Sequence, residues 1–341
     1  MEMDSSGSIR ILSRLFPGTA GALLLLMLLL LPAHPAGAQE EPAYHVKWIG
    51  MIPEEPGAKA VSIGDRVSRI VFGQKPRELI KPFNLVALNP EQLWILDQGS
   101  GGIYEVDRGR GGMIRSLKRE RGTFPSMVGI CRTPGGDLLF TDSRLNRVVR
   151  LSEEGVQYFS DTVVLDQPTG IACNPKNGDI WVVETGAHRI SRFSPEGKPT
   201  GSFGGRGSGE GLFNYPTFIC IDGEGRIYVV DSMNYRIQIL DEEGRYVGSF
   251  GEAGDATGYM ARPKGVATDS RGHIYVADAL FHVVQIFDRQ GRFLDTFGSQ
   301  GQGEGEFWMP AGLYIDDRDR IYVADSYNAR IQIFQLENDT L

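Results

Sequence analysis

The chain has 341 residues, of which 41% are hydrophobic, and this is enough to build a sizeable core. Its 35 basic and 43 acidic side chains give a formal net charge of −8, and no long basic run occurs. Nucleic-acid binding normally requires a concentrated basic surface, so this charge balance argues against it.

Residues 1–38 have the pattern of an export signal. Arg10 and Arg14 precede the leucine-rich run Ala22–Leu31, and Ala36-Gly37-Ala38 place small residues where a signal peptidase reads them. The apolar run is shorter than the roughly 20 residues that span a bilayer. We therefore expect cleavage after Ala38 and an extracytoplasmic protein, periplasmic or secreted. The alternative is an uncleaved segment that anchors the protein to a membrane. We expect membrane contact only through this segment, and only if it stays uncleaved.

From about residue 82 to 334 the chain repeats itself six times. The last copy, Ile321–Phe334, reads IYVADSYNARIQIF, and each copy has an acidic residue at the end of its first apolar strand: Asp97, Asp142, Glu184, Asp231, Asp278 and Asp325. The steps between these acidic residues are 45, 42, 47, 47 and 47 residues. Self-similarity at such a period indicates a repeat architecture.

Each repeat has the pattern of four antiparallel strands. In the fifth repeat, a small Gly-containing strand at Pro263–Thr268 precedes Ile274–Ala277, which is apolar on both faces, as in a sheet buried between two others. Val284–Phe287 and Phe293–Phe297 supply the third and fourth strands. The sequence therefore predicts an all-β six-bladed β-propeller of four-stranded antiparallel blades. An open solenoid is the alternative.

The two ends of the repeat array indicate how the ring closes. Strong repeats end in a strand that closes on Phe-Gly, and Ser68–Gly73 reads SRIVFG before any repeat has begun, whereas the last repeat lacks such a strand. We expect Ser68–Gly73 to complete the last blade, because closure removes an exposed sheet edge. The propeller would then occupy residues 68–341, and residues 39–67 would form an N-terminal extension in which Tyr44–Ile52 has the character of a strand.

The repeat resembles a known family. An acidic residue, Asn, Arg and an alternating Ile-Gln-Ile strand follow a Tyr-Val strand, as in Asp231/Asn234/Arg236 and Asp325/Asn328/Arg330, and Phe-Gly with a Gly-rich stretch comes next. This pattern is similar to the NHL repeat over about residues 68–334. The resemblance implies a β-propeller, but no single function, since the family includes binding platforms and a few enzymes.

Features that recur in every blade are interpreted as structural. The repeated carboxylate is expected to accept hydrogen bonds from turn backbone N–H groups and from the Arg five positions on, as in Glu184/Arg189. The Gly-rich stretches Gly204–Gly211 and Gly298–Gly305 lack a following helix and are expected to be loops between blades. The three cysteines, Cys131, Cys173 and Cys220, fall in the first strands of successive repeats and are expected to be small core residues.

Two histidines occupy one register. His188 and His282 each lie four residues after the acidic residue, in repeats three and five. In the peptidyl-amidating lyases, which this repeat resembles, His at that register on alternate blades binds zinc, but the third such position here is Gly101. Two imidazoles are one ligand short of the usual three for a catalytic zinc, so we expect turn histidines, no metal and no cofactor.

Recognition is therefore expected on the face that collects the loops between blades and the turns between second and third strands. Aromatic and Arg side chains are common at interface hot spots. The candidates for ligand binding are Arg144, Arg206, Tyr215, Tyr235, Tyr259 and Trp308. The sequence favours an exported, non-enzymatic scaffold for a protein, peptide or glycan partner. The alternative is a metal-assisted hydrolase or lyase in the central channel, lactonase-like or amidating-lyase-like.

Overall fold

The computed structural model describes residues 45–53, 79–107, 112–116, 124–152, 154–160 and 163–337, with the backbone alone for 112–116. The export pattern of residues 1–38 lies outside these ranges. No helix in the described part of the chain has the length and apolar character needed to cross a membrane.

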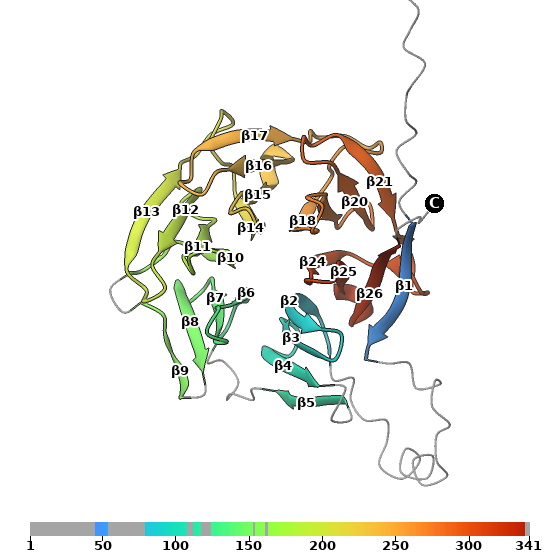
Figure 1. The fold of residues 1–341 in the computed structure, drawn as a ribbon, viewed down its shortest axis with the longest axis horizontal. Helices are drawn as coiled ribbons and strands as arrows, with labels where there is room; N and C mark the ends of the chain where they lie inside the picture. Colours follow the sequence, from blue (N-terminus) through green and yellow to red (C-terminus); the bar gives the residue numbers. More distant parts are fainter. Residues whose placement is uncertain are drawn as a thin grey trace, which may run out of the picture. The chain divides into compact units, whose positions relative to one another are not determined.

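The described residues form six four-stranded antiparallel sheets arranged as blades around a central channel (Figure 1). The innermost strands are β2 (Pro82–Asn89), β6 (Met127–Arg132), β10 (Pro168–Cys173), β14 (Pro216–Ile221), β18 (Pro263–Thr268) and β24 (Pro310–Ile315). The second strands are β3 (Gln92–Asp97), β7 (Leu138–Asp142), β11 (Ile180–Glu184), β15 (Ile227–Asp231), β19 (Ile274–Asp278) and β25 (Arg320–Asp325).

The outer half of each blade is built in the same order. The third strands are β4 (Gly102–Asp107), β8 (Arg147–Ser152), β12 (Arg189–Phe193), β16 (Arg236–Leu240), β20 (Val283–Phe287) and β26 (Arg330–Glu337). The outermost strands are β5 (Gly112–Ser116), β9 (Gly155–Tyr158), β13 (Pro199–Gly204), β17 (Tyr246–Phe250), β21 (Phe293–Phe297) and β1 (His45–Ile52). Short pieces lie between strands: β22 (Ser299–Gln300), β23 (Glu306–Phe307), and the 3₁₀ turns η3 (Ser232–Asn234) and η4 (Ser326–Asn328). The predicted six-bladed architecture is confirmed.

Closure by an N-terminal strand is confirmed, but the closing segment is β1 and not the predicted Ser68–Gly73. β1 pairs antiparallel with β26 from His45↔Glu337 to Ile52↔Ile331, so the first and the last described strands lie side by side in blade six (Figure 1). Val46 and Trp48 pack on the core between blades five and six, and Ile52 on the core between six and one. β1 is the better closing strand because it pairs along β26 and makes apolar contacts on both faces, whereas Ser68–Gly73 offers only a short strand that ends in Phe-Gly. Ser68–Gly73 itself lies outside the described residues.

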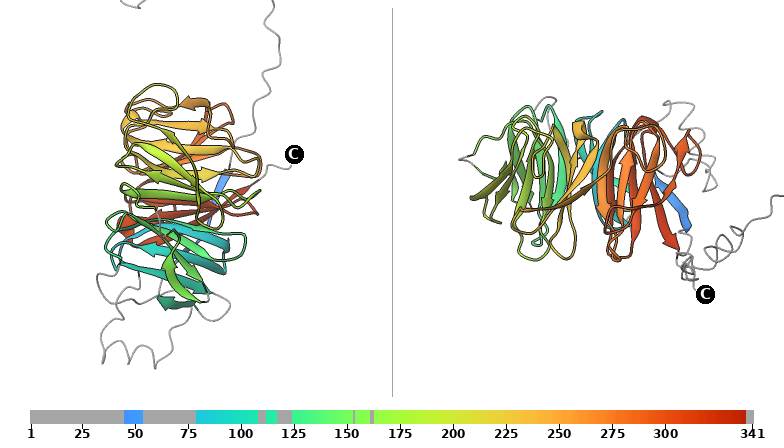
Figure 2. Two further views of the ribbon diagram at one scale, coloured as in Figure 1. Left: turned by 90° about the vertical axis from the view of Figure 1, so that its left-hand side faces the viewer. Right: turned by 90° about the horizontal axis from the view of Figure 1, so that it is seen from above.

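The core is distributed between the blades. One apolar cluster lies between each pair of neighbouring blades, and the cluster of blades six and one completes the circle. Four of the second strands are buried at every residue, and five of the six carry a fully buried aromatic side chain: Phe140, Trp181, Tyr228, Tyr275 and Tyr322. Each blade therefore depends on both of its neighbours for burial, which edge-on views of the packed sheets illustrate (Figure 2).

Candidate functional site

The antiparallel order of the strands gives the ring two different faces. The turns from first to second and from third to fourth strands lie on one face, called here the turn face. The turns from second to third strands and the loops between blades lie on the other, called here the loop face. Backbone hydrogen bonds join the two kinds of segment on the loop face, such as Met233 N–H to Asn214 O and Tyr327 N–H to Trp308 O.

The repeated carboxylate organises each loop-face turn as expected. Asp231 is fully buried and accepts hydrogen bonds from Asn214 N–H at 2.7 Å and from Asn234 Nδ2 at 2.8 Å. It also forms an ion pair with Arg236, whose Nε lies 2.9 Å away. Glu184 with Arg189 and Asp325 with Arg330 form the same pair. The second blade departs, because Arg147 donates to Val163 O. These carboxylates are held within the fold and lie outside any exposed site.

The Gly-rich stretches are loops between blades, and polar side chains of the next blade hold them. Arg236 donates to Gly209 O and Leu212 O, and Asn234 donates to Gly207 O. Gln238 is fully buried, accepts from Gly211 N–H at 3.0 Å and donates to Leu212 O. Gln285 and Gln332 repeat these contacts. We did not predict this role from the sequence, although a Gln between two branched apolar residues in the third strand of three successive repeats is a usable signal.

His188 and His282 connect neighbouring blades. Both have positive φ, 55° and 61°, and each Nδ1 accepts a backbone N–H from the next loop, from Tyr215 and Met309 respectively, at 3.1 Å. Asn146 at the same register accepts Gln167 N–H through its side-chain oxygen at 3.1 Å. One ring nitrogen of each His therefore has a structural partner. Among the described residues, no three His, Cys, Asp or Glu side chains gather as metal ligands would.

The structure places the six predicted ligand-binding residues on loop-face segments, but in different environments. Arg144 and Arg206 are exposed. Tyr215, Tyr259 and Trp308 are also exposed, and the Tyr215 ring contacts His188 at a tilt of 59°, with ring centroids 4.4 Å apart. Tyr235 is partly buried against the core between blades four and five. Tyr235 is therefore the weakest of the six for contact with a partner.

Exposed apolar side chains are concentrated on this face. Of the thirteen large exposed hydrophobic residues in the described part of the chain, four lie on outermost strands, and the other nine lie on loop-face segments: Ile80, Val164, Leu212, Tyr215, Met233, Tyr259, Leu280, Trp308 and Tyr327. Trp308 (42% exposed) and Tyr327 (53% exposed) have ring centroids 6.0 Å apart. Blades four, five, six and one contribute most of the set, so the loop face is asymmetric.

A group of cations borders the same side of the loop face. Lys264 is the second residue of β18 and half-buried, and burial lowers the pKa of its amine to about 8, with further lowering by the charges of Arg262 and Lys81. Lys81 Nζ lies 5.1 Å from the centroid of the Tyr327 ring. Among the described residues, no carboxylate pairs with Lys264. An unpaired, half-buried ammonium is costly, which favours an anionic partner group here.

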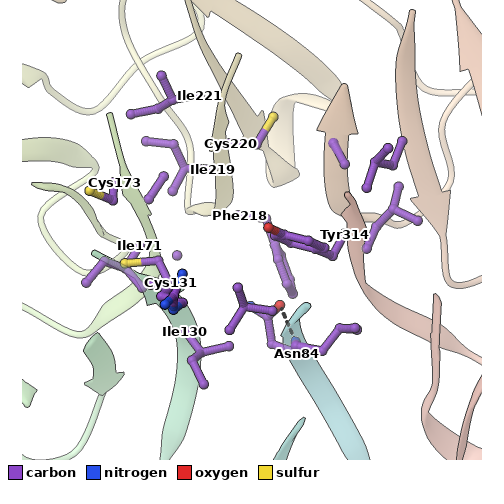
Figure 3. A pocket seen from close by; sticks show the side chains of 18 of the residues that line it. Asn84, Ile130, Cys131, Ile171, Cys173, Phe218, Ile219, Cys220, Ile221 and Tyr314 are labelled. Atoms are coloured by element: carbon purple, nitrogen blue, oxygen red, sulfur yellow. Dashed lines mark hydrogen bonds between the residues drawn. The ribbon is translucent and has the colours of Figure 1, made fainter. Parts of the chain in front are cut away.

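The central channel contains a cavity of about 470 Å³. It is lined by the later residues of the six innermost strands and by residues of the turn face, such as Thr133, Pro134 and Pro175. Phe83 and Phe218 come from opposite blades, with ring centroids 5.7 Å apart. In Figure 3, Ile171, Ile219, Cys131 and Cys173 lie on one side of the opening, and the Tyr314 hydroxyl points into it from the other.

The three cysteines line this cavity and are free thiols. Burial raises the pKa of all three, that of Cys173 to about 11, and the carboxylates of Asp179 and Asp222 raise those of Cys173 and Cys220 further. The thiols therefore stay protonated and behave as apolar lining. Cys131 is buried as expected, whereas Cys173 and Cys220 are partly open to the cavity.

Comparison with known proteins agrees with this architecture. Residues 165–193 and 213–240 match the model of the NHL repeat, and residues 262–340 match a family described as 6-bladed beta-propeller. The chain is an NHL-repeat β-propeller. No curated protein sequence matches it.

Solved structures of low sequence identity share the fold. An auxiliary nutrient binding protein from Bacteroides ovatus is 14% identical, with a TM-score of 0.60 over 87% of this chain and 77% of that one. Virginiamycin B lyase from Staphylococcus aureus is 15% identical, with a TM-score of 0.55 over 86% of this chain and 100% of that one. A putative gluconolactonase is 13% identical, with a TM-score of 0.58 over 77% and 90%. Such distant similarity establishes the propeller fold alone, so the function has to be inferred from the residues of the site.

Proposed function

We propose that this NHL-repeat propeller is an exported, non-enzymatic binding protein that holds a polypeptide partner on its loop face. The supporting observation is the concentration of exposed apolar and aromatic side chains on that face, beside Lys81, Arg262 and Lys264. A concentration of exposed apolar side chains on one face is typical of interaction sites. The export pattern of residues 1–38 supports an interaction outside the cytoplasm.

The composition of the face favours a polypeptide over a glycan. Aliphatic side chains such as Ile80, Met233 and Leu280 lie on the same face as the aromatic rings, and all three are more than half exposed. Sugars need polar donors and acceptors around a stacking ring, whereas apolar side chains of a peptide match this surface. The unpaired Lys264 adds a position for a carboxylate, so the contacting segment is expected to be apolar and acidic.

Capture from the native extracytoplasmic fraction, followed by mass spectrometry, tests this function. The variant Tyr215→Asn/Tyr259→Ser/Trp308→Ser removes three exposed rings, and Asn suits the positive φ of 49° at residue 215. Capture of the specific polypeptide should fall about tenfold or more, with unchanged thermal unfolding. The control is Tyr158→Ser, an exposed ring on the outermost strand β9. Equal capture by the triple variant, or capture of glycan alone, would contradict the proposal.

The metal-assisted alternative makes a different prediction about His188 and His282. Asn146 performs the same inter-blade contact with an amide oxygen, so His188→Asn/His282→Asn preserves the hydrogen bond and removes both imidazoles. Under the proposed function, this double variant keeps its fold and captures the partner normally. If it lost a hydrolytic or lyase activity that the parent protein showed together with stoichiometric zinc, the enzymatic reading would replace ours.

A further inference from the structure

The cavity in the central channel lies on the opposite side of the ring from the proposed partner site. Its lining comes from the later halves of the innermost strands, which end at the turn face. A volume of about 470 Å³ is within the range of roughly 300–1,000 Å³ usual for small-molecule sites. The cavity is therefore large enough for an organic ligand and separate from the loop-face residues.

The lining is apolar with one charged side chain. Branched and small residues such as Ile130, Ile171, Ile219 and Val266 supply most of the wall. Arg132 is the single charged residue among those that line the cavity, and its buried Nε has no hydrogen-bond partner. A buried donor without a protein partner is costly, and such a group usually binds a water, an ion or a ligand, or has a function.

The charges around the opening leave Arg132 available. Asp222 and Asp316, which follow β14 and β24, are neutralised by Arg226 at 2.9 Å and Arg320 at 2.7 Å. The guanidinium carbon of Arg132 lies 6.0 Å from the centroid of the Trp94 ring, and no described carboxylate forms an ion pair with this side chain. Tyr314 lines the same cavity and is within electrostatic reach of Arg132. A guanidinium and a hydroxyl thus converge at one apolar cavity.

We propose that this cavity binds a small amphipathic carboxylate, with its apolar body between the innermost strands and its carboxylate at Arg132 and Tyr314. The arginine donates in the geometry that suits a carboxylate, and the tyrosine hydroxyl adds a second donor. The Phe83–Phe218 pair offers an aromatic surface for the far end of the apolar body. This site is independent of the proposed partner site, so either can fail without the other.

Decanoate and decanol are the matched probes, because they share an apolar body and differ in charge. Displacement of the fluorescent anion 1-anilinonaphthalene-8-sulfonate from the mature protein, confirmed by calorimetry, measures their affinities. Decanoate should bind at least about tenfold more tightly than decanol, since a charge-assisted hydrogen bond to a guanidinium contributes that much. Decanoate should also slow the reaction of Cys173 with a thiol reagent.

Arg132→Gln should weaken decanoate about tenfold and change decanol less than twofold, whereas Tyr314→Phe should weaken decanoate by a smaller factor. The control is Arg150→Gln in β8 of the same blade, because Arg150 lies outside the cavity lining and donates to Pro195 O. Thermal unfolding checks the fold of each variant. Thr268→Trp, which adds bulk to the wall, should block both probes. No saturable binding by the parent protein, or an equal loss of acid and alcohol in Arg132→Gln, would overturn the proposal.

Discussion

At the scale of single residues, the least expected contributor is the buried Gln of the third strand. Gln238→Ala removes the acceptor for Gly211 N–H and the donor to Leu212 O and Asp231 Oδ2. Because buried groups lose their partners, we expect the free energy of unfolding to fall by about 1–3 kcal/mol, measured by urea denaturation. The Gly211 amide should also exchange its hydrogen faster.

Gln290→Ala is the matched control, since Gln290 is exposed on a turn and its change should alter stability by less than about 0.5 kcal/mol. Similar losses at the two positions would show that the Gln238 contacts contribute little. Reduced partner capture in Gln238→Ala is a further expectation, because the loop that Gln238 holds presents Tyr215.

Lys264 is expected to destabilise the folded protein although it is proposed to bind a carboxylate of the partner. Burial and the nearby cations lower its pKa to about 8, below the value near 10.4 of an unfolded chain. The charged form is therefore disfavoured by folding, and the amine destabilises the protein below pH 8. Lys264→Met should stabilise it at pH 7 by roughly 1 kcal/mol after allowance for solvent, about 2 °C in the thermal midpoint.

The gain should be largest below about pH 8 and should shrink as the pH rises from 8 toward about 10.4, where Lys264 of the unfolded chain also loses its proton. Lys198→Met, an exposed control, should leave the midpoint unchanged. At the same time Lys264→Met should weaken partner capture, because a carboxylate loses its cation. A variant that is neither stabilised nor weaker in capture would remove Lys264 from the proposed site.

At the scale of the turn, Glu184 shows how the stability contributed by the repeated carboxylate of the loop-face turns depends on pH. Burial raises its pKa, but hydrogen bonds from Arg189, Ser191 and Asp166 N–H and the charge of Arg189 outweigh burial, so the net pKa is lowered. A lowered folded-state pKa contributes stability above the unfolded value of about 4.3, and this contribution is lost as the pH falls through the folded value.

Glu184→Gln should therefore cost roughly 1–2 kcal/mol at pH 7, and the difference from the parent protein should shrink below about pH 4. Urea unfolding between pH 3 and 7 measures it, with Glu210→Gln in an exposed loop as control. A difference that stays constant across this range would mean that the carboxylate charge is not what stabilises the turn.

The elements also show what the sequence could predict. Strand positions followed from alternation and from the repeat, because each blade packs on copies of itself and local patterns agree with the whole fold. The turn roles of Asp231, His188 and His282 followed from their register. The cavity could not be predicted in this way. Its lining comes from six strands of different blades, and a local sequence pattern does not give the distances between them across the channel. Phe218 occupies a position that is Gly in four other blades, yet its contact with Phe83 depends on ring closure.

At the scale of the whole molecule, the fold depends on closure of blade six by β1. The sequence favours Ser68–Gly73 for this position because local similarity to Phe-Gly strands ignores length, whereas β26 extends to Glu337 and needs a partner along all of it. Deleting residues 39–53 should expose the edge of β26, and the protein should lose stability or self-associate through that edge. Size-exclusion chromatography and thermal unfolding measure both effects.

Point substitutions separate the two segments. Ile52 is buried in the core between blades six and one, so Ile52→Asp should lower the free energy of unfolding by about 3 kcal/mol or more, because it places a charge among apolar side chains. Val71→Asp in Ser68–Gly73 is the matched control and should cost less, since β1 already occupies the fourth position of the blade. A larger loss at Val71 than at Ile52 would return closure to the Phe-Gly segment.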